Sequence, residues 1–396
     1  MPGRKKAKTE QPRRKKRKKY RLKDTDLKSG DFVLVLLVFA LVVFGIVMVF
    51  SSSYYSAIDA GQTPYTYLIK DIIFAVTGAG LMLFMALVDY KKLAPLAPWL
   101  MVIAIILLGL LFTPLGMNVQ GATRWLNLGV TTIMPGEITK ICTIIFVAWF
   151  LSSKPGRVNS LTQGILPMLV LCGVLGGLIM LQPNMSTAIT VIGIIIMMMF
   201  VDGLHWKYLG GLVGLGAAGM IALIFTDSGG YRLQRVTSFL DPFKQVQGNG
   251  YQVVQSLYAL GSGGLFGVGL GNSIQKTLYL PEPQNDFILA IIGEELGYIT
   301  IIILMLVYAF LIWRGIKIAM NAPDKFGMLL AAGITLMIGI QVMMNIAVVT
   351  SSMPPTGVTL PFISYGGNAL WLFMGSAGIL LNISRHSPAK TIQEEK

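Results

Sequence analysis

Long runs of apolar residues, separated by short polar segments, recur along most of this chain of 396 residues. A run of about 20 apolar residues is long enough to cross the hydrocarbon core of a membrane as an α-helix. The pattern therefore predicts an all-α polytopic membrane protein with ten transmembrane helices. The predicted spans are residues 32–52, 72–88, 93–112, 135–152, 161–181, 185–201, 208–225, 287–313, 326–350 and 366–383.

Two of the segments between these spans are too long to be simple connections. They cover residues 113–134 and residues 227–285, and the second lies between the seventh and eighth predicted helices. Loops of more than about 12–15 residues are usually functional or disordered. The second loop mixes aromatic, basic and glycine residues, so we expect it to fold back on the bundle, with a short helix over 253–260. Both long loops fall on the outer side of the membrane, which predicts that the protein acts there.

The distribution of charge predicts the orientation. The net charge is +14, and residues 1–30 hold 14 of the 32 Lys and Arg residues but only three of the 18 acids. This basic tail, residues 1–31, is predicted to be disordered and to lie on anionic lipid at the cytoplasmic face, with a specific partner or nucleic acid as the alternative. The short loops on that side are also rich in Lys and Arg, as the positive-inside rule requires. Residues 32–385 then form the membrane domain, and residues 386–396 form a cytoplasmic C-terminal tail.

The stretch LYLPEPQNDFILAIIGEELG, residues 278–297, runs from a polar loop into an apolar span and carries several acids. Asp286 falls where the loop meets the hydrocarbon, which is a costly position for a carboxylate that has no function. Glu294 and Glu295 are neighbours within the span and point in different directions, so they cannot act as one pair. We expect at least one of them to pair with Lys140 or to cap a broken helix.

The fourth span opens with PGEITK, residues 135–140. Proline suits the first turn of a helix, and Glu137 lies where the helix dipole favours an anion. Glu137 and Lys140 are three residues apart, which places them on one helix face, where they can pair. Two interpretations stay open. The pair is a structural one that fixes helix packing, or Lys140 points into a cavity and holds a phosphate or orients an acid.

Glycine-rich and irregular segments gather on the outer side. Residues 261–271, GSGGLFGVGLG, lack the GK[ST] of a phosphate loop and predict a re-entrant or tightly packed segment whose backbone approaches a ligand closely. Residues 353–367, MPPTGVTLPFISYGG, predict irregular backbone, which is tolerated at membrane depth only where it is buried or lines a cavity.

Basic residues on the outer side are suited to an anionic headgroup, although snorkelling at the interface is the simpler reading of them. They are Arg124, Arg232, Arg235, Lys244 and Lys276. The candidate substrate-binding residues combine some of these with polar residues of the outer segments. The set is Arg124, Glu137, Lys140, Arg232, Arg235, Gln252, Ser262, Lys276 and Ser364.

Several kinds of active site are excluded by the sequence. It has no HExxH motif, Cys/His cluster or Walker sequence, and His205 and His386 both fall on the inner side. Cys142 and Cys172 lie in apolar spans, which predicts small buried side chains rather than a disulfide or a metal site. A lone acid, Asp286, is left at a polar outer cavity near basic residues. One carboxylate can deprotonate an acceptor hydroxyl while a lipid pyrophosphate leaves, so Asp286 is the candidate catalytic residue.

Seven motifs stand in order along the chain. They are GATRWLNLG at 121–129, PGEITK at 135–140, LQPNMSTA at 181–188, YRLQRVTSFLDP at 231–242, YQVVQSLYALGSGGLFGVGLGNS at 251–273, LPEPQNDFILAIIGEELG at 280–297 and TGVTLPFISYGG at 356–367. Together they resemble the SEDS proteins (shape, elongation, division and sporulation) over residues 32–387. The wording of ALGSGG and PEPQNDF is more similar to the FtsW/SpoVE branch than to the RodA branch.

The resemblance implies a peptidoglycan glycosyltransferase of the bacterial plasma membrane, with both termini in the cytoplasm. Such an enzyme polymerises lipid II into β-1,4 glycan strands on the outer face, with inversion, for cell division or sporulation. The family's essential acid maps to Asp286, and its GATRW and P-x-E-x-x-K residues map to Arg124, Glu137 and Lys140. The implied partners are a class B penicillin-binding protein (a transpeptidase), lipid II, undecaprenyl pyrophosphate and other divisome or elongasome proteins, with no nucleic acid. No cofactor is certain, and a divalent cation (Mg²⁺ or Mn²⁺) is the one considered.

The chain departs from the family pattern at three places. Gly136 replaces the usual Ser after Pro, Asn184 replaces the Asp of LQPD, and Asn368–Ala369 replaces the Ser pair after YGG. The change at Asn184 puts a catalytic or metal role for that position in doubt. Two other functions compete with the enzyme: a flippase of lipid-linked precursors, against which the lack of an evident internal repeat weighs, and a non-catalytic division scaffold.

Overall fold

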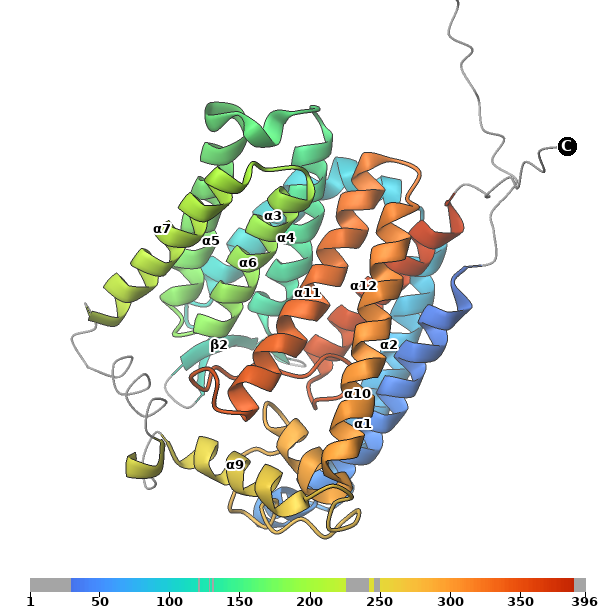
Figure 1. Ribbon diagram of the computed structural model, residues 1–396, viewed down its shortest axis with the longest axis vertical. Helices are drawn as coiled ribbons and strands as arrows, with labels where there is room; N and C mark the ends of the chain where they lie inside the picture. Colours follow the sequence, from blue (N-terminus) through green and yellow to red (C-terminus); the bar gives the residue numbers. More distant parts are fainter. Residues whose placement is uncertain are drawn as a thin grey trace, which may run out of the picture.

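The computed structural model describes residues 30–119, 122–127, 129, 132–225, 242–245 and 250–387. Long helices stand side by side in a bundle, and the short helix α9 (Tyr251–Gly263) crosses one end of it (Figure 1). The long helices are α1 (Phe32–Asp59), α2 (Thr66–Leu87), α3 (Leu93–Leu110), α4 (Pro135–Ser152), α5 (Leu166–Met180), α6 (Met185–Val201), α7 (Trp206–Phe225), α10 (Ile288–Met320), α11 (Lys325–Val349) and α12 (Gly367–Arg385).

The fold is that of a multi-pass membrane protein. Within the described part of the chain, eight helical segments are long and apolar enough to cross a membrane. Helix α6 is a shorter apolar helix of 17 residues, and α7 covers the seventh predicted span. Each of the ten predicted spans therefore contains a helix. Over the described residues, eight of these helical segments are long and apolar enough to cross a membrane by themselves. The short helix predicted at 253–260 is confirmed within α9.

The fold is all-α, as predicted, and the first long loop adds a small antiparallel sheet that was not predicted. Its strands β1 (Gly116–Val119), β2 (Ala122–Asn127) and β3 (Thr132–Ile133) pair in the order β1-β2-β3. A loop that folds against the bundle has to pair its own backbone N–H and C=O groups. In β2, Ala122 and Leu126 are buried, so the strand packs through alternate positions.

The start of α1 and the end of α12 lie together at one end of the bundle. Asp31 caps α1 by accepting a hydrogen bond from the Leu34 N–H (3.1 Å), and its own N–H donates to Ser384 Oγ near the end of α12 (3.1 Å). The Asp31 carboxylate also lies 2.6 Å from Arg314 Nη2 of α10. The start of α1 and the end of α12 lie at the end of the bundle away from α9 and β2 (Figure 1). An even number of spans predicts this arrangement.

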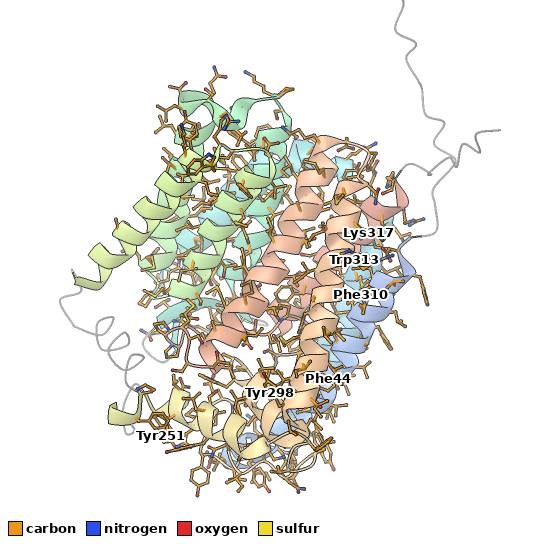
Figure 2. All side chains as sticks on the ribbon, viewed as in Figure 1. Phe44, Tyr251, Tyr298, Phe310, Trp313 and Lys317 are labelled. Atoms are coloured by element: carbon orange, nitrogen blue, oxygen red, sulfur yellow. The ribbon has the colours of Figure 1, made fainter. Side chains whose placement is uncertain are left out.

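Aromatic and basic side chains mark that end of the bundle on its outside. Phe310 and Trp313 of α10 stack with ring centroids 5.3 Å apart, and Lys317 Nζ lies 4.0 Å from the centroid of the Trp313 ring. Figure 2 shows this group toward the face where the termini meet, with Tyr298 and Tyr251 toward the other face. Trp, Tyr and Lys gather where hydrocarbon meets water, so the group is suited to a boundary of the membrane.

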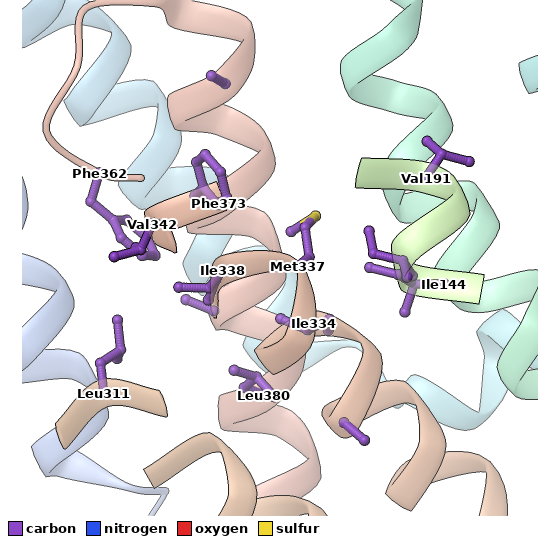
Figure 3. Packing of buried hydrophobic residues seen from close by; sticks show 14 of the residues in the cluster. Ile144, Val191, Leu311, Ile334, Met337, Ile338, Val342, Phe362, Phe373 and Leu380 are labelled. Carbon is purple, nitrogen blue, oxygen red and sulfur yellow. The ribbon is translucent and has the colours of Figure 1, made fainter. Parts of the chain in front are cut away.

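Helix α11 is the packing centre of the bundle, in contact with α4, α6, α10 and α12. Figure 3 shows Ile334 and Met337 of α11 facing Ile144 of α4 and Val191 of α6, with Phe373 of α12 on the other side. All five side chains are buried. Protein interiors of this kind are close-packed and have low compressibility, so their side chains and backbone move little. Polar groups on α11 are therefore held at fixed positions.

Helix α10 is broken at Gly297, whose φ of 81° and ψ of 176° are not helical. The glycine-rich segment after α9 pairs with the backbone groups that the break frees. The Val268 N–H donates to the Glu294 carbonyl (2.9 Å), and the Tyr298 N–H donates to the Gly264 carbonyl (2.9 Å). An unsatisfied peptide group in hydrocarbon costs several kcal/mol. The predicted tight packing of this segment is confirmed, but its partner is the α10 backbone rather than a ligand.

Replacing Gly297 by alanine should therefore destabilise the protein strongly. A Cβ at this position would lie 2.4 Å from both Gly267 N and Leu265 O, in a left-handed backbone conformation that costs about 1–3 kcal/mol on its own. We expect a clear fall in the unfolding temperature in detergent. Gly261→Ala is the matched control, because a Cβ there meets nothing within 4 Å. Equal unfolding temperatures for the two variants would contradict the role given to the break.

Candidate active site

A cavity of about 350 Å³ lies at the end of the bundle that carries β2 and α9. Its walls come from β2, the starts of α4 and α6, the loop before α10, helix α11 and the loop between α11 and α12. It brings together candidate residues that are up to 162 positions apart in the sequence. Those that line it are Arg124, Glu137, Lys140, Gln252 and Asp286.

Asp286 stands where the loop turns into α10, which begins at Ile288. The loop is held by a tight turn, in which the Asn285 N–H donates to the Glu282 carbonyl (3.1 Å) and Asn285 Nδ2 donates to Glu282 Oε2 (2.9 Å). Glu282 has a φ of 47°, a left-handed conformation that a non-glycine residue adopts only when its surroundings impose it. This strained turn places Asp286 at the wall of the cavity.

Arg124 and Asp286 both lie close to Gly357 at the wall of the cavity. Arg124 comes from β2, and its Nη2 donates to the Pro183 carbonyl at 2.6 Å. A Cβ built on Gly357 would lie 3.8 Å from Arg124 Nη1 and 3.9 Å from Asp286 Oδ2. Gly357 has a φ of +74°, so glycine is favoured there both by conformation and by space. The guanidinium of Arg124 and the carboxylate of Asp286 are therefore both close to Gly357 in the cavity wall.

The predicted pair between Glu137 and Lys140 is confirmed, with Lys140 Nζ 2.7 Å from Glu137 Oε1. Both side chains are buried, and both residues line the cavity. Over the described residues, Glu137 Oε2 has no hydrogen-bond partner. The ion pair that the structural interpretation expects is present, and Lys140 also lines a cavity, as the functional interpretation expects. Its contact with a phosphate stays a prediction. The pair fixes the start of α4 and places a cation in the same cavity as Asp286.

The departures from the family pattern have local structural roles. Asn184 caps α6, with its Oδ1 accepting from the Thr187 N–H (3.3 Å), a role that Asp also fills. Gly136 packs against the same threonine, because a Cβ there would lie 3.2 Å from Thr187 Cγ2. Asn368 lines the cavity, and its Nδ2 donates to the Thr132 carbonyl (3.3 Å).

The structure corrects the placement of three candidate substrate-binding residues. Lys276 is only 3% exposed, and its Nζ lies 2.6 Å from Glu295 Oε1 and 3.0 Å from Ser51 Oγ, away from the cavity. Ser262 Oγ donates to the Ala259 carbonyl (3.0 Å), and Ser364 Oγ accepts from the Leu360 N–H (2.8 Å). The polar side chain of each of the three residues interacts with another group of the protein. Arg232 and Arg235 lie outside the described residues.

The two adjacent acids of α10 point apart, as predicted, and each has its own partners. Glu295 pairs with Lys276, rather than with Lys140. Glu294 accepts hydrogen bonds from the Ser273 hydroxyl and from the Ile274 N–H (2.9 Å). The acids therefore fasten the short helical piece between Asp286 and the break to the preceding loop, so their role in the described structure is to hold that piece in place.

Two amide side chains in the apolar run of α11, beside the cavity, were not predicted as candidate functional residues. Gln341 lines the cavity, and Asn345 lies one helical turn further on and is fully buried. The available signal was an amide within a membrane span, which is rare without a purpose. Tyr365 also lines the cavity. Burial, with Tyr67 and Asp71 nearby, raises the pKa of Tyr365 to about 12, so its phenol keeps its proton at neutral pH and can donate a hydrogen bond.

Comparisons with known proteins agree with this architecture. The family model FTSW_RODA_SPOVE, described as "Cell cycle protein", matches residues 32–389. "Stage V sporulation protein E" of Bacillus subtilis is 43% identical over 91% of this chain and 98% of its own length. A "Probable peptidoglycan glycosyltransferase FtsW" of Trichlorobacter lovleyi is 40% identical over 93% of this chain and 95% of its own length.

Two solved structures share the fold. One comes from work titled "Structural coordination of polymerization and crosslinking by a peptidoglycan synthase complex", with a TM-score of 0.74, 26% identity and coverage of 90% of this chain and 98% of that chain. The other is the rod shape determining protein RodA of Thermus thermophilus, with a TM-score of 0.68, 26% identity and coverage of 91% and 98%.

The buried pair of Lys276 and Glu295 gives a test of the corrected placement. Lys276→Met should destabilise the protein by about 3–5 kcal/mol, because Glu295 is then left as an unpaired buried carboxylate. Adding Glu295→Gln should recover much of this loss, since the remaining amide carries no charge. The measurement is the unfolding temperature of the purified protein in detergent. A double variant no more stable than Lys276→Met would show that the pair does not carry the effect.

Proposed function

This chain belongs to the SEDS family of FtsW, RodA and SpoVE, and on that premise we propose that it is a peptidoglycan glycosyltransferase that polymerises lipid II. The observation that carries the proposal is the approach of Asp286 and Arg124 to Gly357, in a cavity that also holds the Glu137–Lys140 pair. A carboxylate and two cations that line one cavity suit a reaction in which a hydroxyl loses a proton and a pyrophosphate leaves.

In the proposed reaction, Asp286 acts as general base. It takes the proton of the 4-hydroxyl of the GlcNAc of the acceptor lipid II, and that oxygen attacks the anomeric carbon of the growing chain. The bond from this carbon to the pyrophosphate oxygen breaks, and undecaprenyl pyrophosphate leaves with the bonding electrons. Attack from the opposite side inverts the carbon and gives a β-1,4 linkage.

The cations of the cavity would stabilise the leaving group. As the bond breaks, negative charge develops on the pyrophosphate, and fixed positive groups in a partly dry site stabilise it more than water does. Arg124 and Lys140 line the cavity and are the first candidates. The guanidinium of Arg124 also has the planar donor geometry that suits phosphate oxygens. Arg232 and Arg235 stay candidates for the same role.

A divalent cation, Mg²⁺ or Mn²⁺, stays part of the proposal in a limited form. Over the described residues, no group of three or more His, Cys, Asp or Glu side chains gathers as a ready-made metal site. Mg²⁺ is often held by one or two carboxylates together with substrate phosphates. If a cation takes part, Asp286 and the pyrophosphate oxygens are the ligands that this site would offer, and the cation would neutralise charge on the leaving group.

The membrane placement follows from the same proposal. The cavity would open at the outer face of the bacterial plasma membrane, with ten spans and both termini in the cytoplasm. It lies at the end of the bundle opposite to Arg314 and to the ends of the described chain, which supports this orientation. The sugar would then react at the water boundary while the lipid tail stays in the bilayer.

A transpeptidase of the class B penicillin-binding proteins is the proposed partner, for cell division or sporulation. The similar structure that belongs to a peptidoglycan synthase complex supports this part of the proposal. The relatives named for FtsW and for a stage V sporulation protein support the two growth processes. Cross-linking by the partner would act on the strands that this chain makes.

Asp286→Asn should abolish lipid II polymerisation by the purified protein together with its partner, because the amide keeps the size of the side chain but cannot accept the proton. Gel analysis of glycan strands measures the product, and the unfolding temperature checks folding. Asp59→Asn is the matched control, since Asp59 is an exposed acid at the end of α1.

Strands from the Asp286→Asn variant would move the base elsewhere, with Glu282 as the next candidate. If neither the wild type nor the variant made strands in the presence of the partner, a flippase or a scaffold would explain the chain better than an enzyme.

A further inference from the structure

Asn345 of α11 forms two hydrogen bonds that the reaction scheme above does not use. Its Nδ2 donates to the Asp286 carbonyl at 2.8 Å and to the Val358 carbonyl at 2.8 Å. The side chain is fully buried. An atom that lies 2.8 Å from two carbonyl oxygens has to be a donor of two hydrogens, so the orientation of the amide is settled by its neighbours.

The two bonds join segments that are far apart in the sequence and form adjoining parts of the cavity wall. One segment is the loop that ends in Asp286, and the other is the loop that contains Gly357 and Val358. The helix that carries Asn345 is the packing centre of the bundle. Because the donor stands on a close-packed helix, both loops are fastened to the least deformable part of the structure.

We propose that Asn345 is a positioning residue, whose carboxamide fixes the separation between the Asp286 carboxylate and the Arg124 guanidinium by holding the two loops together at Gly357. The proposal rests on the function proposed above. Asn345 would not touch the substrate itself. It acts through the backbone of Asp286, whose carbonyl it holds, and through Val358, which follows Gly357.

The distances at Gly357 explain why this fastening matters. A Cβ on Gly357 would lie 3.9 Å from Asp286 Oδ2 and 3.8 Å from Arg124 Nη1, so both the acid and the cation lie close to the second loop. If the bond to either loop is lost, the loops can separate and the acid moves relative to the guanidinium. A misplacement of about 1 Å in an active site can cost about a hundredfold in rate.

The oxygen of the same side chain makes the interpretation more specific. Over the described residues, Asn345 Oδ1 has no hydrogen-bond partner. The amide therefore contributes to the described contacts through its two N–H groups. Replacement by Leu keeps a similar volume and removes both donors. Replacement by Asp keeps the shape and leaves at most one donor, and then only when the acid is protonated.

The chain also offers a matched control in Asn382 of α12. This residue is equally buried and makes two hydrogen bonds to the backbone, with Nδ2 donating to the Ala86 carbonyl (2.8 Å) and Oδ1 accepting from the Tyr90 N–H (3.0 Å). It lies near the opposite end of the bundle, where α12 ends and where Tyr90 stands in the short segment between α2 and α3. Asn382→Leu removes the same number of bonds without touching the cavity.

The test compares the variants Asn345→Leu, Asn345→Asp and Asn382→Leu in the purified full-length protein with its partner. Three quantities are measured: kcat and KM for lipid II polymerisation, and the unfolding temperature. A fourth is the affinity for lipid II in the Asp286→Asn background, where no turnover is expected. We expect kcat of Asn345→Leu to fall about 10- to 100-fold, with KM and affinity changed by less than about threefold. Asn382→Leu should lower the unfolding temperature and leave kcat within about twofold of the wild type.

A positioning role and a merely structural role give different results. If Asn345→Leu and Asn382→Leu lower the unfolding temperature alike and both keep the wild-type kcat, the proposal is overturned. It is also overturned if Asn345→Leu weakens lipid II binding as strongly as it slows turnover, because Asn345 would then shape the binding site. Should Asn345→Leu fail to fold, Asn345→Asp decides the question, since a folded variant with the wild-type kcat rejects the role.

Failure of the proposed function is seen separately. A lack of polymerisation by the wild type with its partner shows it, whereas polymerisation by Asp286→Asn shows that the base is another residue; both results are known before the Asn345 variants are compared. In either case the positioning role is rejected as well, because Asn345 would have no catalytic acid to hold. An inactive Asp286→Asn together with a fully active, folded Asn345→Leu rejects the positioning role alone and leaves the proposed function standing.

Discussion

The absence of water in the hydrocarbon is the constraint on which the rest of this structure depends. Every backbone N–H and C=O at membrane depth needs a partner within the protein, and α10 is broken at Gly297, where a continuous helix would supply these partners itself. The glycine-rich segment after α9 supplies them instead, through bonds such as Val268 N–H to the Glu294 carbonyl. Only glycines allow the two backbones to come this close. The break is therefore tolerated at membrane depth because a second segment pairs with the backbone groups that it frees.

The short helical piece before the break is what places Asp286. It is fastened at its far end by Glu294, which accepts from the Ile274 N–H, and by Glu295, which pairs with Lys276. A buried ion pair contributes little net stability, but breaking it by removal of one partner is costly. Such pairs are thus better understood as fixing one arrangement than as the source of the fold's stability. At its near end, the same helical piece begins directly after Asp286. The contacts of Glu294 and Glu295 therefore also determine where Asp286 lies.

Much of this organisation could be predicted from the sequence, and the failures have physical reasons. Apolar runs predicted a helix at every span, and the three-residue spacing of Glu137 and Lys140 predicted their pair, because both signals are local. The partner of Lys276 could not be predicted, because a charged residue in a loop can reach several partners and only the fold decides that Glu295 is the one. The sheet around β2 was missed because its pairing depends on how the loop meets the bundle. Asn345 gave a signal, an amide in an apolar run, but nothing local says which carbonyls it meets.

The choice of an amide at position 345 is consistent with the rest of the site. A carboxylate near Asp286 would add negative charge beside the proposed base and would repel the two carbonyl oxygens that have to be held. A lysine would offer donors, but it would bring a second buried cation with a large cost of desolvation. A neutral carboxamide supplies two donors from one atom and adds no charge to those of Asp286, Glu282, Arg124 and the Glu137–Lys140 pair, which line the cavity. At this position the acid can therefore be held without changing the charge around it.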